Sequence, residues 1–211
     1  APNGTQRVPI IISGPNETSV VVHADVFNPE APGPENVEGF VEGNGYVSME
    51  AEHYTRAVDA PPIAWKNIPD LGRTLGAMTT FPVTAPSQTP GGDSPHLEYR
   101  MHLFSNGDVT VKAHLSPTLN FHATEGLRYA VSIDDEPPQI VNMHAGENNR
   151  MWERWVANNI NIGVSQHHVD SPGEHVLKFW MVDSGVVLQK LVVETTELAP
   201  RYLGPPESFH Q

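Results

Sequence analysis

Two neighbouring stretches of the chain alternate between apolar and polar residues, and this period of two constrains the fold more than any other feature. The odd-numbered positions of residues 97–104 are all apolar, and residues 108–115 alternate in a similar way. Such alternation is the pattern of a β-strand with one buried face. Asn106-Gly107 lies between the two stretches, and an Asn-Gly pair in that position predicts a β-hairpin.

Further short stretches of the same character recur between proline- and glycine-containing segments. The chain has 20 prolines and 17 glycines among 211 residues, a content that fits many turns. We therefore predict a mostly all-β fold, a β-sandwich or jelly roll. The predicted strands lie at residues 7–13, 18–27, 46–51, 97–104, 108–115, 128–134, 138–143, 174–182 and 186–194.

One short amphipathic helix is predicted among these strands, at residues 148–160. Met151 and Trp155 are four residues apart, as are Trp152 and Val156. Side chains at this spacing lie on the same side of a helix, which gives it an apolar face.

A proline-rich, acidic stretch at residues 28–38 divides the chain, and such a composition predicts a linker or an extended strap. Before it, residues 1–27 predict a β-hairpin, which we expect to pack on the main domain. Residues 39–211 form that domain, and the length suffices for one large β-domain with a small extension.

Charge and cysteine content exclude several classes of function. The chain has 25 acidic and 12 basic residues, a formal net charge of -13, which disfavours nucleic acid and anionic membranes as partners. The absence of cysteine excludes disulfides, thiolate metal sites and thiol catalysis. No apolar stretch approaches the roughly 18 residues of a membrane-spanning helix.

Two N-glycosylation sequons lie near the start of the chain, at Asn3 and Asn16. Together with the missing cysteines and the low lysine content, they favour a secreted, extracellular glycoprotein. No signal peptide is visible, and the sequence begins Ala1-Pro2-Asn3. We therefore expect a processed or excised piece of a longer protein.

Several ordered stretches carry a resemblance to a known family. They cover residues 39–42 and 45–56, then Trp65 and residues 68–73, and a C-terminal block at 156–160, 172–178, 182–190 and 202–208. Over about residues 39–209, the chain resembles the C-terminal domain of the family 115 glycoside hydrolases, the xylan α-1,2-glucuronidases. One departure is Ser184, where a proline is more typical, and we expect it to alter a turn but no chemistry.

The resemblance implies an accessory module. Enzymes of this family remove 4-O-methylglucuronic acid from xylan side chains, with catalytic carboxylates in an upstream domain, so no catalytic residue is predicted here. The family's C-terminal domain resembles β-sandwich carbohydrate-binding modules. The implied partners are glucuronoxylan or xylo-oligosaccharides, the upstream catalytic domain and a second copy in a homodimer. The alternatives are a structural or dimerisation module without sugar affinity and a stand-alone carbohydrate esterase.

Tryptophan side chains are the first candidates for sugar binding, because sugars stack on flat apolar faces. Trp65 follows Ala60-Pro61-Pro62 in a predicted loop, and Trp152 lies beside a charged helix face, so we choose these two. Trp155 and Trp180 are expected in the core. For Trp65 and Trp152, a place in the core is the competing interpretation.

A structural calcium ion is the one cofactor that the resemblance implies. In calcium-bearing carbohydrate-binding modules, two glutamates of an E-A-E strand and a carboxylate of the last strand hold the ion. Here the corresponding residues are Glu50, Glu52 and Gln189, and Gln189 offers only a neutral carbonyl next to Lys190. Calcium requires six to eight oxygen ligands. The alternative is that both glutamates pair with basic or backbone groups of the protein.

Three other polar groups have simpler interpretations. His167 and His168 are adjacent, and adjacent residues of a strand point to opposite faces, so a shared metal ion is not expected. Gly92-Asp93-Ser94 lies in a proline- and glycine-rich loop without the strand–turn–helix context of a nucleophilic serine. Asp134-Asp135-Glu136 precedes two prolines, which predicts a solvated turn between strands.

Overall fold

The computed structural model describes residues 3–29, 31–33 and 36–211. Its contacts divide the chain into two units, Ala1–Val37 and Glu38–Gln211. In the first unit, β1 (Gly4–Ser13) and β2 (Ser19–Asn28) form an antiparallel hairpin. The hairpin expected from the sequence is therefore present. Its packing on the main domain stays a prediction, and Glu30, Pro34 and Glu35 of the strap lie outside the described residues.

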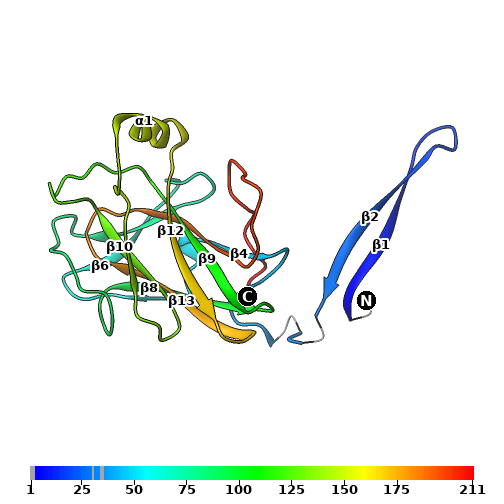
Figure 1. Cartoon of the computed structure of the whole chain (residues 1–211), viewed down its shortest axis with the longest axis horizontal. Coiled ribbons are helices and arrows are strands. Elements are labelled where there is room, and N and C mark those ends of the chain that lie inside the picture. Colours follow the sequence, from blue (N-terminus) through cyan, green and yellow to red (C-terminus); the bar gives the residue numbers. More distant parts are fainter. Residues whose placement is uncertain (1–2, 30, 34–35) are drawn as a thin grey trace. The chain divides into compact units, whose positions relative to one another are not determined.

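The second unit is a β-sandwich of two six-stranded sheets (Figure 1). We name the sheets after their long strands β13 and β14. The β13 sheet contains β11 (Gln139–Asn142), β10 (Arg128–Ile133), β13 (Gly173–Met181), β8 (His96–Leu103), β3 (Phe40–Val41) and β5 (Arg56–Val58). The β14 sheet contains β12 (Asn161–Val169), β9 (Gly107–Leu115), β14 (Leu188–Glu194), β7 (Ala77–Phe81), β6 (Ala64–Ile68) and β4 (Tyr46–Glu50).

The core lies between the two sheets and follows from the alternation of their strands. Tyr99 and Phe179 point inward from the β13 sheet, and Val111 and Leu191 point inward from the β14 sheet. All four side chains are at most 1% exposed. Burying such side chains stabilises the fold by about 1.5–3 kcal/mol each. The predicted mostly-β sandwich is thus confirmed.

The predicted helix is present as α1 (Asn149–Asn158) and lies at one end of the sandwich (Figure 1). The Asn148 side chain accepts a hydrogen bond from Met151 N, which caps the first turn. Asn159 has left-handed backbone angles and closes the last turn. No helix among the described residues has both the length and the apolar character needed to cross a membrane.

The hairpin predicted at Asn106-Gly107 is wrong, because the strands on its two sides belong to different sheets. β8 pairs with β13, whereas β9 pairs with β12 and β14. The connection crosses the end of the sandwich, where the buried Glu42 carboxylate accepts hydrogen bonds from Phe104 N and Ser105 N at 2.6 and 2.8 Å. Alternation identifies the buried face of each strand, but not its partner.

Five strands of the sandwich have no counterpart in the predicted set: β3, β5, β6, β7 and β12. Trp65 was expected in a loop and lies in β6. β12 is long, but its inward positions include Asn161, Ser165 and His167, so the polar residues on its buried face conceal the alternation. The other missed strands have five residues or fewer.

Ser184, the departure from the family pattern, is fully buried. Its hydroxyl donates to Val83 O at 2.7 Å and lies 3.0 Å from His122 Nε2. The side chain thus fixes the turn after β13 through hydrogen bonds that a proline has no group to form.

The C-terminal segment covers part of the outer face of the β14 sheet. Gly204 packs on His114 of β9 so closely that an added Cβ would lie 2.9 Å from the imidazole Cε1. Burial lowers the pKa of His114 from 6.5 to about 4, and the positive charges of Lys190, Arg73 and Lys112 act in the same direction. His114 is therefore neutral in the folded protein over most of the acidic range.

This pKa predicts a loss of stability on acidification. Between about pH 6.5 and about pH 4 the unfolded chain binds a proton at His114 that the folded chain does not, so stability falls as the pH is lowered through this window, by up to about 3 kcal/mol. A His114→Gln variant, which stays neutral, should lack this contribution. Urea unfolding of both proteins at several pH values measures the difference, and parallel pH profiles would contradict the prediction.

Candidate functional site

Trp65, the first sugar-binding candidate, lies in the core. Its side chain is 8% exposed, and its ring meets Phe179 edge-on with centroids 6.2 Å apart. The indole N–H is buried and has no hydrogen-bond partner among the described residues. This placement matches the competing interpretation for Trp65, since little of the ring face is open to a ligand.

Trp152, the second candidate, lies on α1 and is half-buried. Its ring packs edge-on against Trp155, with centroids 6.4 Å apart, and Trp155 in turn lies 6.3 Å from the His144 ring. Part of the Trp152 surface is therefore accessible. Sugar binding at Trp152 stays a prediction.

The three candidate calcium ligands each have other partners. The Glu50 carboxylate lies 2.9 Å from Lys190 Nζ and accepts a hydrogen bond from Thr74 Oγ1. Lys190 reaches it because the two residues are paired in register between β4 and β14. A positive ammonium at the carboxylate opposes a second cation at the same place.

Among the described residues, Glu52 and Gln189 make their hydrogen bonds with groups other than Glu50. Glu52 follows β4 in a short 3₁₀ turn, Ala51–His53, and its carboxylate accepts from Asn67 Nδ2 at 2.7 Å. Gln189 accepts from Arg73 N at 3.1 Å and donates to Ser116 Oγ at 2.9 Å. The three side chains do not fit a calcium ion in this arrangement, which favours the alternative of internal pairing. Calcium binding stays a prediction.

The adjacent histidines point to opposite faces of β12, as their positions imply. His167 is buried and bonds Glu136 and Ser165. His168 is exposed and bonds Asp108 at 2.7 Å. That hydrogen bond, with the charges of Asp108 and Asp170, raises the pKa of His168.

A pocket of about 460 Å³ opens on the β13 sheet, on the face that points away from the core. The face follows from alternation, since Phe179 belongs to the core and the neighbouring Trp180 lines the pocket. Strands β5, β8, β10 and β13 form the floor and two turns form the rim. The lining residues are Arg56, Gly91, Gly92, His96, Glu98, Ser132, Asp134, Asp135, Glu136, Pro137, Pro138, Lys178 and Trp180.

One row of the pocket floor is aromatic. Trp180 on β13 is paired in register with Ala130 on β10 and with His96 on β8. The Trp180 and His96 rings lie with centroids 4.1 Å apart, and Trp180 Nε1 donates to Ser132 Oγ at 2.9 Å. Trp180 is 4% exposed, so the indole is held firmly and only a small part of it reaches the pocket.

The next row of the floor is charged. Lys178, Glu98 and Arg56 are paired in register across β13, β8 and β5. The Glu98 carboxylate lies 3.5 Å from Arg56 Nε and 3.1 Å from His96 Nε2. Lys178 Nζ donates to Asp134 O at 2.8 Å. Opposite charges that alternate along the row hold these long side chains in place.

The acidic turn between β10 and β11 forms one side of the rim. Asp134 bonds His175, and Glu136 bonds His167. Asp135 is exposed and has no hydrogen bond or ion pair among the described residues. Of the three carboxylates, Asp135 is thus the one available to a ligand.

This arrangement suits a ligand with many hydroxyl groups. A sugar hydroxyl both donates and accepts, and the pocket offers carboxylates as acceptors beside ammonium and guanidinium groups as donors. Near the opposite rim, the Ser94 hydroxyl donates to Thr89 O at 2.5 Å, and the Ser94 carbonyl oxygen lies 2.7 Å from His96 Nδ1. The pocket thus presents charged groups that can bind hydroxyls.

Trp180 is buried and Asp134 and Asp135 are exposed, as the sequence predicted, but these expectations did not show that the three residues line one pocket. The available signal was the alternation around Phe179, which puts Trp180 and Lys178 together on the outer face. The pairing of β13 with β8 and β10, which completes the site, has no local signal.

Comparison with known proteins relates the chain to glycoside hydrolases. Residues 39–207 match the model of the glycosyl hydrolase family 115 C-terminal domain. The solved structure of BtGH115A, a family GH115 4-O-methyl-α-glucuronidase with specificity for decorated arabinogalactans, is similar with a TM-score of 0.57 and 18% identity. The match covers 82% of this chain and 20% of that one, so the chain spans a fifth of BtGH115A.

Two carbohydrate-binding modules are similar at lower scores. The C-terminal CBM6 of LamC, a laminarinase from Zobellia galactanivorans, gives a TM-score of 0.46 at 12% identity, covering 71% of this chain and 98% of that one. The CBM35 of Abf62 from Cellvibrio japonicus gives 0.45 at 10% identity, covering 70% and 91%. No curated protein sequence matches the chain.

The buried Lys190–Glu50 pair generates a stability prediction. Lys190→Met leaves the Glu50 carboxylate, 4% exposed, without its counter-charge, which should lower the free energy of unfolding by about 3–5 kcal/mol. The double variant Glu50→Gln/Lys190→Met should lose less, because no buried charge remains. Urea unfolding measures the free energy of both variants. A Lys190→Met protein as stable as the wild type would contradict the pairing.

The calcium prediction has its own test. A rise in the wild-type melting temperature with added calcium would support it.

Proposed function

The chain belongs to the glycosyl hydrolase family 115 C-terminal domain family, and from this membership we propose that it is the carbohydrate-binding accessory module of a multidomain α-glucuronidase. The module is not itself the catalyst in this proposal. An upstream catalytic domain removes 4-O-methylglucuronic acid, and the module holds the polysaccharide near it. The polymer we propose is glucuronoxylan.

The observation that carries this proposal is the pocket on the β13 sheet. Its floor joins an aromatic row at Trp180 and His96 to a charged row at Lys178, Glu98 and Arg56. Trp180 and His96 are 4% and 3% exposed and support the floor, whereas Arg56 and Asp135 are the exposed groups that can bind sugar hydroxyls. The concave surface also lies on rigid strands, which reduces the entropy cost of binding.

Binding is tested by calorimetric titration of the purified chain with glucuronoxylan and its aldouronic oligosaccharides, with and without calcium. Arg56→Ala and Asp135→Asn should each weaken binding about 10-fold or more, because a hydrogen bond to a charged group contributes about 1.5–3 kcal/mol. Arg150→Ala is the matched control, since Arg150 is exposed on α1 and does not line the pocket.

The outcomes separate the competing sites and polymers. Binding that survives Arg56→Ala but is lost in Trp152→Ala would move the site to α1. Titration with a decorated arabinogalactan compares the proposed polymer with the polymer for which BtGH115A is specific. The absence of binding to every polysaccharide would overturn the sugar-binding proposal and favour a structural module.

Association with a second copy is the second candidate function, and the N-terminal hairpin favours it. Ile10, Ile12 and Val20 lie on one face of the hairpin and are 49%, 57% and 63% exposed, and a two-stranded hairpin buries little apolar surface by itself. Contiguous exposed apolar surface marks an interaction site. Light scattering distinguishes a dimer that becomes a monomer on Ile12→Lys/Val20→Lys from a chain whose mass these changes do not affect.

We also propose that the protein is secreted and N-glycosylated. Asn3 and Asn16 are both exposed, and Asn16 lies in the turn of the hairpin. Expression through a eukaryotic secretory pathway should give a chain that loses mass on enzymatic deglycosylation. Asn3→Gln/Asn16→Gln should remove that change in mass, and an unglycosylated wild-type chain would contradict the proposal.

A further inference from the structure

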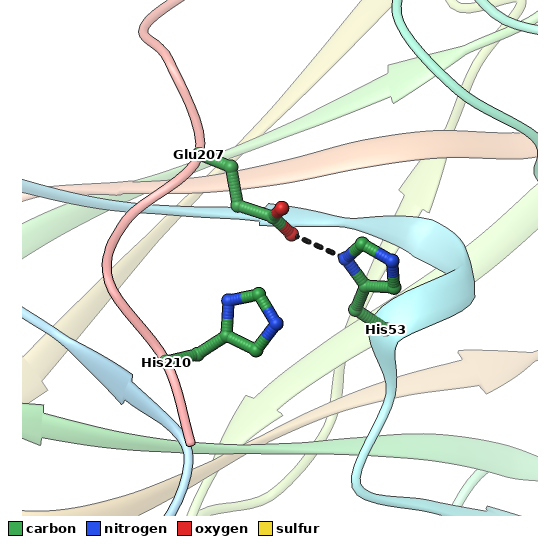
Figure 2. A group of neighbouring side chains, drawn as sticks. All are labelled: His53, Glu207 and His210. Carbon is green, nitrogen blue, oxygen red and sulfur yellow. Dashed lines mark hydrogen bonds and ion pairs between the residues drawn. The ribbon is translucent and has the colours of Figure 1, made fainter.

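His53, Glu207 and His210 form a cluster whose ligand atoms all lie within 4.8 Å of one another. Figure 2 shows Glu207 and His210 on the C-terminal segment and His53 on the turn after β4, with all three side chains directed to a common space. His53 Nδ1 lies 2.8 Å from Glu207 Oε1, and the two imidazole rings have centroids 5.2 Å apart. The cluster lies apart from the pocket on the β13 sheet and shares no residue with it.

We propose that His53, Glu207 and His210 form a binding site for a divalent transition-metal ion such as zinc. Two imidazoles and one carboxylate are a common donor set for zinc, with metal–ligand distances of about 2.0–2.2 Å. Neighbouring ligands of such an ion are then about 3 Å apart, close to the present separation of His53 and Glu207. Calcium and magnesium prefer oxygen ligands alone, so the imidazoles select against them.

The backbone places both residues of the C-terminal segment. Val41 N donates to Phe209 O at 2.9 Å, and Ser208 N donates to Ser48 O at 2.9 Å. Glu207 and His210 are therefore attached to a segment that is hydrogen-bonded on both sides to the sandwich. A site on a fixed backbone has less entropy to lose when the ion binds.

Hydrogen bonds also orient the ligands themselves. Glu50 N donates to Glu207 Oε1 at 3.1 Å, which fixes the carboxylate. His210 Nδ1 lies 3.4 Å from Ser208 O, so an Nδ1–H there leaves Nε2 with the free lone pair. Such outer contacts are the usual means by which a protein orients its metal ligands.

The surroundings leave room for the ion and for further ligands. The side chains of His53 and Glu207 are 35% and 22% exposed, and His210 is exposed. A pocket of about 450 Å³, lined by His53, Tyr54, Arg100 and His210, opens beside them. Three protein ligands with an open position allow water or a small anion to complete the coordination. When the ion binds His53 Nδ1, any proton on that atom passes to solvent.

The inference concerns metal binding alone and does not depend on sugar binding. An ion at this site would join the C-terminal segment to the turn after β4. Because it binds the folded chain and not the unfolded one, it stabilises the folded state. Its presence is therefore visible in the melting temperature without any assay of activity.

The test uses the tag-free chain, stripped with a chelator and dialysed, and titrated with zinc chloride by calorimetry and thermal denaturation. The expected result is one bound equivalent and a raised melting temperature. His210→Ala and Glu207→Gln should each weaken zinc binding by about 10-fold or more. Because His210 is exposed and Glu207→Gln retains the side-chain shape, both variants are expected to fold, which circular dichroism checks.

His168→Ala is the matched control, because His168 is an exposed histidine beside two aspartates, Asp108 and Asp170, elsewhere on the sandwich. It should leave zinc binding unchanged. In NMR spectra, the imidazole signals of His53 and His210 should shift together with added zinc. No binding by the wild type, equal binding by His210→Ala, or a loss in His168→Ala would each overturn the proposal.

Discussion

The burial of one face of each sheet against the other is the constraint on which the rest of this structure depends. Once Phe179 and Leu97 point into the core, the neighbouring residues of their strands must point outward. The packing that stabilises the fold therefore also places Trp180, His96 and Glu98 on one outer surface. The strands that form the core thus also form the floor of the candidate sugar-binding pocket.

The same constraint explains how far the sequence could be interpreted. Alternation predicted the long strands other than β12, and the four-residue spacing of apolar residues predicted the helix, since both patterns are local. Alternation did not show that β8 and β9 belong to opposite sheets, because both have an apolar face toward the same core. Where a buried face carries polar residues, as at Ser165 and His167 of β12, the pattern disappears.

The candidate sites were harder to predict than the strands because they join residues distant in sequence. The hydrogen bond between His53 and Glu207 spans 154 positions, and no local motif links them. For the E-A-E motif, the residues were easy to find but their partners were not. The motif was visible in the sequence, yet the register between β4 and β14 gives Glu50 the ammonium of Lys190 as its partner.

The pairing of Gly39 with Gln211 has a consequence for how the module connects to other parts of a protein. Gly39 N donates to Gln211 O at 2.9 Å, and Gln211 N donates back to Gly39 O at 3.3 Å. Gly39 and Gln211 thus lie at neighbouring points of the sandwich, about one strand spacing of 4.8 Å apart. Such a unit can be inserted into a loop of a host protein, or circularly permuted with a short joint, without opening its core.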